Sequence, residues 1–201
     1  MLLPNQLTTL RIILTPVFLF LFLSEDPFYK QLSLIVYILA AITDWYDGWL
    51  ARKFNYITAW GKFMDPLADK ILTSAAFLAF VILGVLELWM VIIIVVRDFL
   101  VTGLRLFADS KKINFSTSNL ARTKTFIQMA FIYYLLLVYT AISFAPLYKG
   151  NEKIFAVLTD PQLVYYSMLF VTLLTLYSGI SYIFNNRILI LQLFSFENKN
   201  S

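Results

Sequence analysis

"DWYDGWLARKFNYITAWGKFMDPLADK", residues 44–70, holds four of the twelve acidic residues of this chain between long apolar runs. The four are Asp44, Asp47, Asp65 and Asp69. Leucine, isoleucine, alanine and phenylalanine dominate the sequence on both sides of the stretch. Ionisable groups in such surroundings are rare without a partner, because hydrocarbon solvates charge poorly. The stretch therefore indicates a polar, functional site inside an apolar fold.

The composition around this stretch predicts a membrane protein. Of 201 residues, 60% are hydrophobic and only 14% are charged, and the mean hydropathy is +0.76. These values lie far from those of an average soluble domain. A helix needs about 20 apolar residues to cross a bilayer, and the apolar runs allow about six crossings. The runs lie near residues 8–23, 31–50, 66–86, 86–108, 125–147 and 162–193.

We expect an all-α integral membrane protein, a bundle of six transmembrane helices with an N-terminal interfacial segment. No repeat or linker divides the chain, so residues 1–201 are predicted to form a single domain. The opening residues have neither the basic start nor the small-residue cleavage site of a removable signal peptide. Residues 84–87 are expected to form a tight turn and residues 144–162 an outer connection, because both contain turn formers.

The distribution of lysine and arginine predicts the orientation in the membrane. With six crossings and the N-terminus inside, all lysines and arginines except Lys30, Lys149 and Lys153 fall on the inner side. Cytoplasmic loops of membrane proteins carry such an excess of positive charge. We therefore expect both termini and the acidic stretch at the cytoplasmic face of the cell membrane.

The residue types that are absent exclude several chemistries. The chain contains no cysteine and no histidine. Disulfides, thiolate chemistry, a Ser-His-Asp triad and a histidine-ligated zinc site are thereby excluded. A carboxylate is the natural candidate for a general base in such a chain.

The spacing of the four aspartates predicts a metal site. Asp44 and Asp47 are three residues apart and Asp65 and Asp69 four apart, so each pair shares one helical face. Two like-charged pairs on consecutive helices could converge only around a cation, and an all-oxygen ligand set suits Mg²⁺ or Mn²⁺. A structural alternative remains for each pair. Asp65 could cap a helix before Pro66, and Asp44 and Asp47 could pair with Arg52 or Lys53.

Residues 44–69 follow the pattern D-x-x-D-G-x-x-A-R, eight residues, then G-x-x-x-D-x-x-x-D. This pattern resembles the complete motif of the CDP-alcohol phosphotransferase family. The matching residues are Asp44, Asp47, Gly48, Ala51, Arg52, Gly61, Asp65 and Asp69. The resemblance implies a membrane enzyme with six helices, usually a homodimer, that transfers a phosphatidyl-type group from a CDP-linked donor to an alcohol and releases CMP.

The same resemblance implies roles for the motif residues. Asp44, Asp47 and Asp65 would be metal ligands, and Asp69 would complete a site for two ions, Mg²⁺ or Mn²⁺. Asp69 would also be the catalytic base that accepts the proton of the acceptor hydroxyl. The CDP moiety would be bordered by Gly48, Ala51, Arg52 and Gly61.

A second group of charged residues bears on the identity of the acceptor. Arg97 and Arg105 are eight residues apart in an apolar run, about two helical turns, and Arg122 and Lys124 open the next helix. Arg97 needs an anionic partner at its depth. That partner could be Asp98, a motif carboxylate, or a phosphate monoester, for which arginine is well suited. Arg105, Arg122 and Lys124 could equally belong to the ordinary positive charge of the inner face.

Three further stretches, "LPNQLTTLRIILTPVF", "VVRDFLVTGLR" and "ARTKTFIQM", are similar to the corresponding stretches of phosphatidylglycerophosphate synthases. Those enzymes join CDP-diacylglycerol to glycerol 3-phosphate. The resemblance implies that Arg97, Arg105 and Lys124 bind the acceptor's phosphate. Asn5 and Thr8, in the first of the stretches, are candidates for lining the donor site.

Other functions share part of these features. A cardiolipin synthase or an inositol-phosphate-transferring relative would have the same motif, and a cation transporter could also have intramembrane acids and bases. A transporter would leave the fixed glycine and arginine positions unexplained. The expected partners are CDP-diacylglycerol, glycerol 3-phosphate, membrane lipids and a second copy of the chain, with no nucleic acid.

Overall fold

A computed structural model describes residues 3–54, 59–111 and 119–190. These residues form eight helices and no strand. The six long helices correspond to the six apolar runs of the sequence, and two short helices connect the last two of them. The helices are α1 (Leu3–Phe22), α2 (Pro27–Phe54), α3 (Ala59–Ile82), α4 (Leu88–Ser110), α5 (Asn119–Ile142), α6 (Ala145–Tyr148), α7 (Glu152–Leu158) and α8 (Pro161–Asn185).

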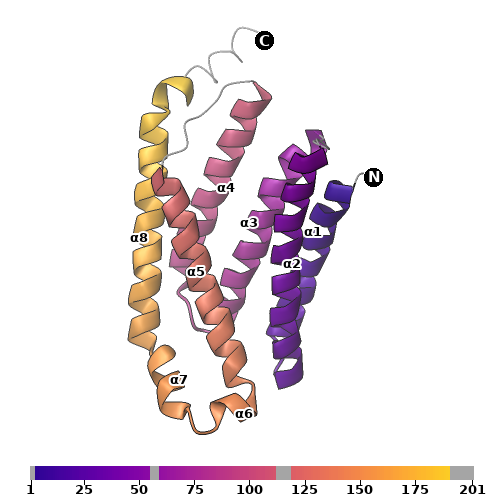
Figure 1. Ribbon diagram of the computed structural model, residues 1–201. Coiled ribbons are helices and arrows are strands. Elements are labelled where there is room, and N and C mark those ends of the chain that lie inside the picture. Colours follow the sequence, from indigo (N-terminus) through magenta and orange to yellow (C-terminus); the bar gives the residue numbers. More distant parts are fainter. Residues whose placement is uncertain (1–2, 55–58, 112–118, 191–201) are drawn as a thin grey trace.

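The long helices run side by side and alternate in direction, as Figure 1 shows. At one end of the bundle α1 begins, α2 ends, α3 begins, α4 ends, α5 begins and α8 ends (Figure 1, top). We call it the upper end. The short helices α6 and α7 lie at the opposite, lower end. The alternation places the end of α2, the starts of α3 and α5 and the end of α4 near the same end, and the predicted site residues lie on these four helices.

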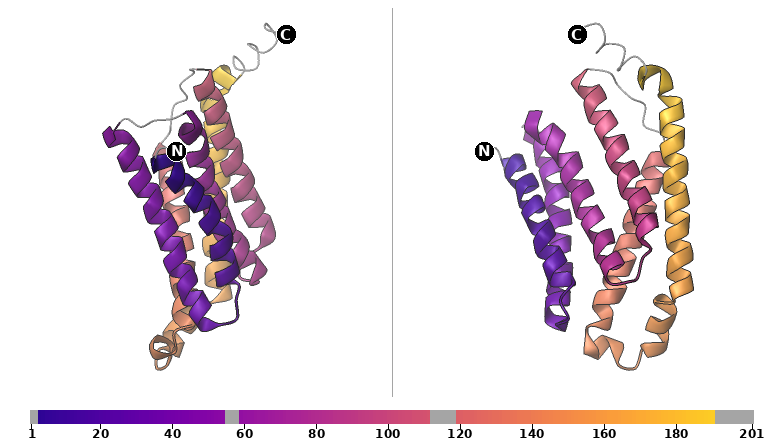
Figure 2. Two further views of the ribbon diagram at one scale, coloured as in Figure 1. Left: turned by 90° about the vertical axis from the view of Figure 1, so that its right-hand side faces the viewer. Right: turned by 180° about the vertical axis from the view of Figure 1, so that it is seen from behind.

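The order of packing places α8 at one side of the bundle, against α4 and α5. α1 packs against α2 and α3, and α3 packs against α4. The last long helix, α8, packs against both α4 and α5 (Figure 2). Side chains of α8 can therefore reach the α4 residues that the sequence identifies as candidates for the acceptor site.

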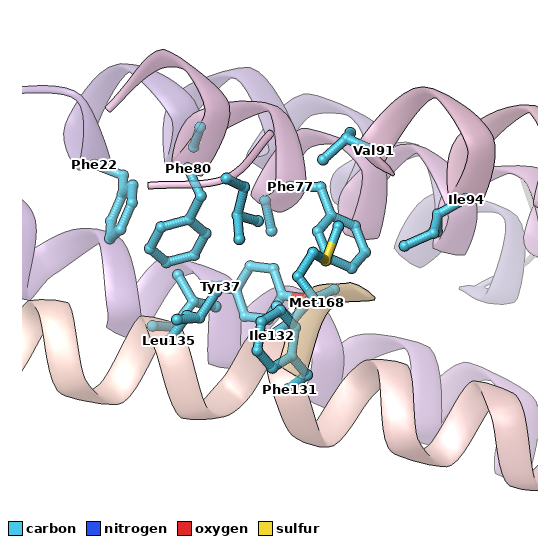
Figure 3. Packing of buried hydrophobic residues seen from close by; sticks show 14 of the residues in the cluster. Phe22, Tyr37, Phe77, Phe80, Val91, Ile94, Phe131, Ile132, Leu135 and Met168 are labelled. Atoms are coloured by element: carbon cyan, nitrogen blue, oxygen red, sulfur yellow. The ribbon is translucent and has the colours of Figure 1, made fainter. Parts of the chain in front are cut away.

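Aromatic side chains join the helices in the buried core (Figure 3). The ring of Phe18 on α1 lies 5.1 Å from that of Tyr37 on α2, and Phe22 meets Phe80 on α3 edge-on at 5.2 Å. Such pairs stabilise a core beyond the area that they bury. On α3, the core residue Phe80 follows Asp69 by about three turns. The dry core therefore lies below the polar residues and supports them.

The turn between α3 and α4 confirms the expectation for residues 84–87. Gly84 has a φ of 71°, in the left-handed region that residues with a Cβ rarely adopt. The backbone N–H of Val85 donates to the carbonyl of Phe80 at 2.9 Å. This hydrogen bond closes the turn at the end of α3, and α4 begins at Leu88 after a short connection.

Two parts of the chain differ from the sequence-based expectation. The N-terminal segment is not separate, because α1 is continuous from Leu3 to Phe22. The expected connection at 144–162 contains the short helices α6 and α7. The apolar residues between its turn formers are enough to form helices of this length. Asp160 then caps α8, accepting from the backbone N–H groups of Gln162 and Leu163, with Pro161 in the first turn.

The outer surface of the bundle is apolar. On α8, Phe170, Tyr177 and Ile180 are 58%, 61% and 62% exposed and recur at helical spacing. Among the described residues, two helical stretches are long and apolar enough to cross a bilayer, Asn119–Ile142 and Glu152–Asn185. A continuous apolar face of this kind is suited to lipid rather than to water. The apolar helices are those of a membrane protein.

Candidate active site

The motif aspartates lie on two consecutive helices. Asp44 and Asp47 are in the last half of α2, and Asp65 and Asp69 are in the first half of α3. The side chains of Asp44, Asp47, Gly48, Ala51 and Arg52 lie outside the described residues, as does the side chain of Asn5. Pro66 lies inside α3 and not at its start, so the structure does not place Asp65 as the cap of that helix.

The α3 half of the motif is partly buried and contacts α1. The hydroxyl of Thr8 on α1 donates to Oδ1 of Asp65. Thr8 is fully buried, and Gly61, one turn before Asp65, is buried as well. Thr8 therefore holds a motif carboxylate in place. This contact brings one of the two N-terminal candidates to the motif.

The described part of this half fits a divalent metal ion in its chemistry. Asp65 and Asp69 offer carboxylate oxygens from one helical face, and hard cations such as Mg²⁺ and Mn²⁺ prefer oxygen ligands. Among the residues that the structure describes, no group of three metal-ligating side chains is present, and two of the four motif aspartates are outside that set.

A buried carboxylate on α4, Asp98, is surrounded by three cations. Its Oδ1 pairs with Nη1 of Arg97 at 3.1 Å and with Nζ of Lys124, and its Oδ2 lies 3.4 Å from Nζ of Lys70. The side-chain amide of Gln128 donates to Oδ2 at 3.3 Å. We refer to these five residues as the Asp98 cluster. It joins α3, α4 and α5 in a place where an isolated charge would be costly.

The Asp98 cluster reaches the motif through Lys70. Nζ of Lys70 also lies 3.7 Å from Oδ2 of Asp69. One lysine therefore stands between the carboxylate predicted to act as a base and the carboxylate of the Asp98 cluster. Such a chain of opposite charges holds its members at defined positions in a medium of low dielectric constant.

A cavity of about 790 Å³ opens beside these groups and is lined by residues of α3, α4 and α5. Asp69, Arg97 and Arg105 all line it, so the structure brings a motif carboxylate and two predicted acceptor residues to one volume. We call it the polar cavity. Its charged lining residues are Asp69, Lys70, Arg97, Arg105, Asp109 and Arg122.

Lys124 has a different position from Arg97 and Arg105. Its side chain is fully buried and its Nζ contacts Asp98, beneath the surface of the polar cavity. Arg97 lies at the boundary, since it pairs with Asp98 and also lines the polar cavity. The sequence-based alternative that Asp98 is a partner of Arg97 therefore agrees with the structure, and it does not exclude a contact of Arg97 with substrate.

Sequence reasoning missed Lys70, Gln128 and Ser178 as parts of this region. Gln128 follows Lys124 by four residues in an otherwise apolar stretch of α5, and that spacing was an available signal. Lys70 directly follows a motif aspartate but looks like ordinary inner-face charge. Ser178, whose hydroxyl accepts from Nη2 of Arg97 at 2.9 Å, had no signal in the sequence.

The fold and the site together define a class, that of helical membrane proteins with a carboxylate and arginine site near one end of the bundle. Comparison with known proteins then gives the family. The family model described as CDP-alcohol phosphatidyltransferase matches residues 1–150. The match covers α1 to α5, and therefore every motif residue and the polar cavity. The chain belongs to the CDP-alcohol phosphatidyltransferase family.

Three curated relatives carry the same name, CDP-diacylglycerol–glycerol-3-phosphate 3-phosphatidyltransferase. The relative from Rickettsia bellii (strain RML369-C) is 40% identical over 127 residues, 63% of this chain and 70% of its own length. That from Bacillus subtilis (strain 168) is 40% identical over 147 residues, 67% of this chain and 76% of its own. The Salmonella paratyphi A protein is 32% identical over 139 residues, 66% of this chain and 75% of its own.

Proposed function

We propose that this protein transfers the phosphatidyl group of CDP-diacylglycerol to glycerol 3-phosphate, giving phosphatidylglycerophosphate and CMP. The relatives named above carry this activity in their name, and the family motif is complete in this chain. The observation that carries the proposal is the polar cavity. Asp69 from α3 and Arg97 and Arg105 from α4 face the same volume, so a base and a phosphate-binding group are available to one acceptor molecule.

In the proposed reaction Asp69 is the catalytic residue. The acceptor's hydroxyl oxygen attacks the phosphorus next to the diacylglycerol, its proton moves to the carboxylate of Asp69, and the bond from that phosphorus to the CMP oxygen breaks. With no histidine in the chain, a carboxylate is the side chain available for this proton transfer. The half-buried position of Asp69 on the wall of the polar cavity supports the assignment.

Members of this family use divalent metal ions. We propose that Asp44, Asp47, Asp65 and Asp69 hold two such ions, Mg²⁺ or Mn²⁺. When bound, they would neutralise charge on the diphosphate and on the departing CMP. Thr8 orients Asp65 for this role through its hydrogen bond. We further propose that Gly48, Ala51, Arg52 and Gly61 border the CDP moiety of the donor, with Asn5 and Thr8 near it.

The charge of the polar cavity supports a phosphorylated acceptor. Among its described lining residues the four cations exceed the two anions by two charges. A phosphate monoester carries about −1.5 to −2 charges at pH 7 and therefore complements this excess. We propose that Arg97 and Arg105 contact the acceptor's phosphate directly. Lys124 would act from beneath, by holding Asp98 and adding positive charge.

We propose that the six long helices cross the membrane as one domain with the upper end in the cytoplasm, and that the protein works as a homodimer. Exposed cations at the upper end include Lys53, Lys111 and Arg122, as the excess of positive charge on cytoplasmic loops requires. The acyl chains of the donor would remain in the inner leaflet of the cytoplasmic membrane. The water-soluble acceptor would enter the polar cavity from the cytoplasm.

The test is CMP release by purified protein in detergent, with CDP-diacylglycerol and Mg²⁺ or Mn²⁺. Glycerol 3-phosphate, phosphatidylglycerol and inositol phosphate are offered in separate reactions. We expect CMP and phosphatidylglycerophosphate with glycerol 3-phosphate alone, and no turnover with chelator. Turnover with phosphatidylglycerol or inositol phosphate in place of glycerol 3-phosphate would contradict the proposal and assign the chain to another branch of the family.

A further inference from the structure

The side chain of Arg97 is held from two helices. Within α4 its Nη1 pairs with Asp98 at 3.1 Å. From α8, the hydroxyl of Ser178 accepts from its Nη2 at 2.9 Å. Ser178 is fully buried and its own hydroxyl donates to the carbonyl of Thr175 at 3.0 Å, which orients its oxygen lone pairs toward the guanidinium. The terminal nitrogens of Arg97 are thus fixed by one charged and one neutral partner.

The next residue of α8, Gly179, makes room for the stem of Arg97. A Cβ atom built on Gly179 would lie 3.0 Å from Cγ and 3.3 Å from Nε of Arg97. Both distances are shorter than an ordinary van der Waals contact. Arg97 therefore occupies space that any other residue at position 179 would claim. The neighbouring atoms belong to a flexible side chain and not to backbone, so a larger residue there would displace Arg97 first.

These contacts connect α8 to the polar cavity, although none of the described lining residues of the cavity belongs to α8. Arg97 lines the cavity together with Asp69 and Arg105. Helix α8, Pro161–Asn185, lies beyond the residues 1–150 that match the family model. The matched residues supply the arginine and its partner Asp98, and a segment outside them supplies the second partner of its guanidinium.

We propose that Ser178 and Gly179 are positioning residues for the acceptor site, which act through Arg97 on the phosphate of the acceptor. This inference rests on the proposed function. Two partners and a close contact restrict the rotamers of Arg97, and a pre-positioned arginine loses less entropy when it binds phosphate. Loss of either residue should therefore weaken binding of a phosphorylated acceptor while the donor site, on α2 and α3, is unaffected.

The test compares Gly179→Ala and Ser178→Ala with the unmodified protein in the CMP-release assay. We expect the KM for glycerol 3-phosphate to rise about tenfold for Gly179→Ala and about threefold for Ser178→Ala, the range of one weakened bond to a charged group. The value of kcat and the KM for CDP-diacylglycerol should stay within about twofold of the original. A purely structural role for these residues would lower the amount of active enzyme and leave both KM values unchanged.

The chain offers matched controls for both substitutions. Gly103 on α4 is an exposed helical glycine whose added Cβ would meet nothing within 4 Å, so Gly103→Ala should leave all three constants unchanged. Ser33 on α2 is fully buried and donates to the carbonyl of Lys30, so Ser33→Ala removes a comparable bond away from Arg97. A rise in the KM for glycerol 3-phosphate in either control equal to that in the α8 variants would overturn the inference.

A double substitution tests the route through Arg97. In an Arg97→Ala background, Ser178→Ala should have no additional effect on the KM for glycerol 3-phosphate, because its partner is gone. Additive effects, or an unchanged KM in Ser178→Ala alone, would overturn the inference. If Gly179→Ala does not fold, the result for Ser178→Ala alone tests the inference, because that substitution adds no atoms. Absence of activity with glycerol 3-phosphate in the unmodified protein would instead contradict the proposed function itself.

Discussion

At the scale of single residues, Asp69 lies where the motif and the polar cavity meet. Its carboxylate lies 3.7 Å from Lys70, which connects it to Asp98, and its side chain faces the volume that Arg97 and Arg105 also line. A carboxylate with these neighbours can serve a metal ion and an acceptor hydroxyl at once. The two roles that we propose for Asp69 can be separated experimentally, because the amide of asparagine retains an oxygen ligand but cannot accept the proton.

We therefore predict that Asp69→Asn lowers kcat at least about a hundredfold, because a general base usually contributes a factor of this size. Binding of CDP-diacylglycerol should be retained. Turnover is followed by CMP release and binding by isothermal titration with the donor. Asp44→Asn, in the other half of the motif, should weaken metal-dependent donor binding itself. Equal loss of binding in the two variants would argue against a separate role of Asp69 as base.

Asp98 is the second residue whose environment allows a quantitative prediction. Asp98→Asn leaves Lys124, Arg97 and Lys70 around a neutral amide, and Lys124 is fully buried. Breaking one side of a buried ion pair costs about 3–5 kcal/mol. We expect a lowered midpoint of thermal unfolding in detergent. Asp109→Asn, an exposed aspartate on the same helix, should change stability by less than about 0.5 kcal/mol. Similar shifts of the unfolding midpoint in both variants would show that the ion pairs of Asp98 do not contribute more to stability than an exposed aspartate does.

At the scale of helices, the apolar runs predicted the six long helices because length and hydropathy are local properties. The two short helices between α5 and α8 were not predicted. The turn formers Gly150 and Asn151 interrupt the apolar residues of this segment, so no long apolar run marks a helix there. The tight turn at Gly84 was predicted from its residue types, and its positive φ explains why a glycine is needed there.

That turn carries a prediction at the same scale. Gly84→Ala forces a Cβ into the left-handed region, at a cost of about 1 kcal/mol or more, although the added atom meets nothing within 4 Å. The loss of stability should therefore come from backbone strain alone. Thermal unfolding in detergent measures it, with Gly103→Ala as the control without strain. A stability for Gly84→Ala at or above that of the unmodified protein would contradict the conformational argument.

The Asp98 cluster shows why the site could be predicted only in part. The four aspartates stand within 26 residues of sequence and at helical spacing, so their pairing could be inferred from the chain alone. Asp98, by contrast, meets Lys70, Lys124 and Gln128 from other helices, and Arg97 meets Ser178, which is 81 residues away. Such contacts depend on how the helices pack, and no local periodicity contains that information.

At the scale of the whole molecule, exposed lysines and arginines lie at both ends of the bundle, and more of those named here lie at the upper end than at the lower end. Exposed Lys53, Lys111 and Arg122 belong to the upper end, while exposed Lys149 and Lys153 belong to the segment around α6 and α7 at the lower end. The polar cavity lies among the helix ends that are rich in cations. The proposed reaction therefore requires one orientation in the membrane, because glycerol 3-phosphate must reach the polar cavity from the compartment that supplies it.

Because the chain contains no cysteine, introduced cysteines can report its orientation in the membrane directly. We predict that Lys149→Cys, in the connection after α6, reacts with a membrane-impermeant maleimide added outside intact cells. Lys111→Cys, at the end of α4, should react only after the membrane is permeabilised, because positive charge is retained in the cytoplasm. Both lysines are exposed, so access to the thiol depends on the compartment rather than on burial. The unmodified protein provides a background free of thiols. Labelling of Lys111→Cys in intact cells, with Lys149→Cys protected, would reverse the orientation and place the polar cavity on the side opposite to the cytoplasm.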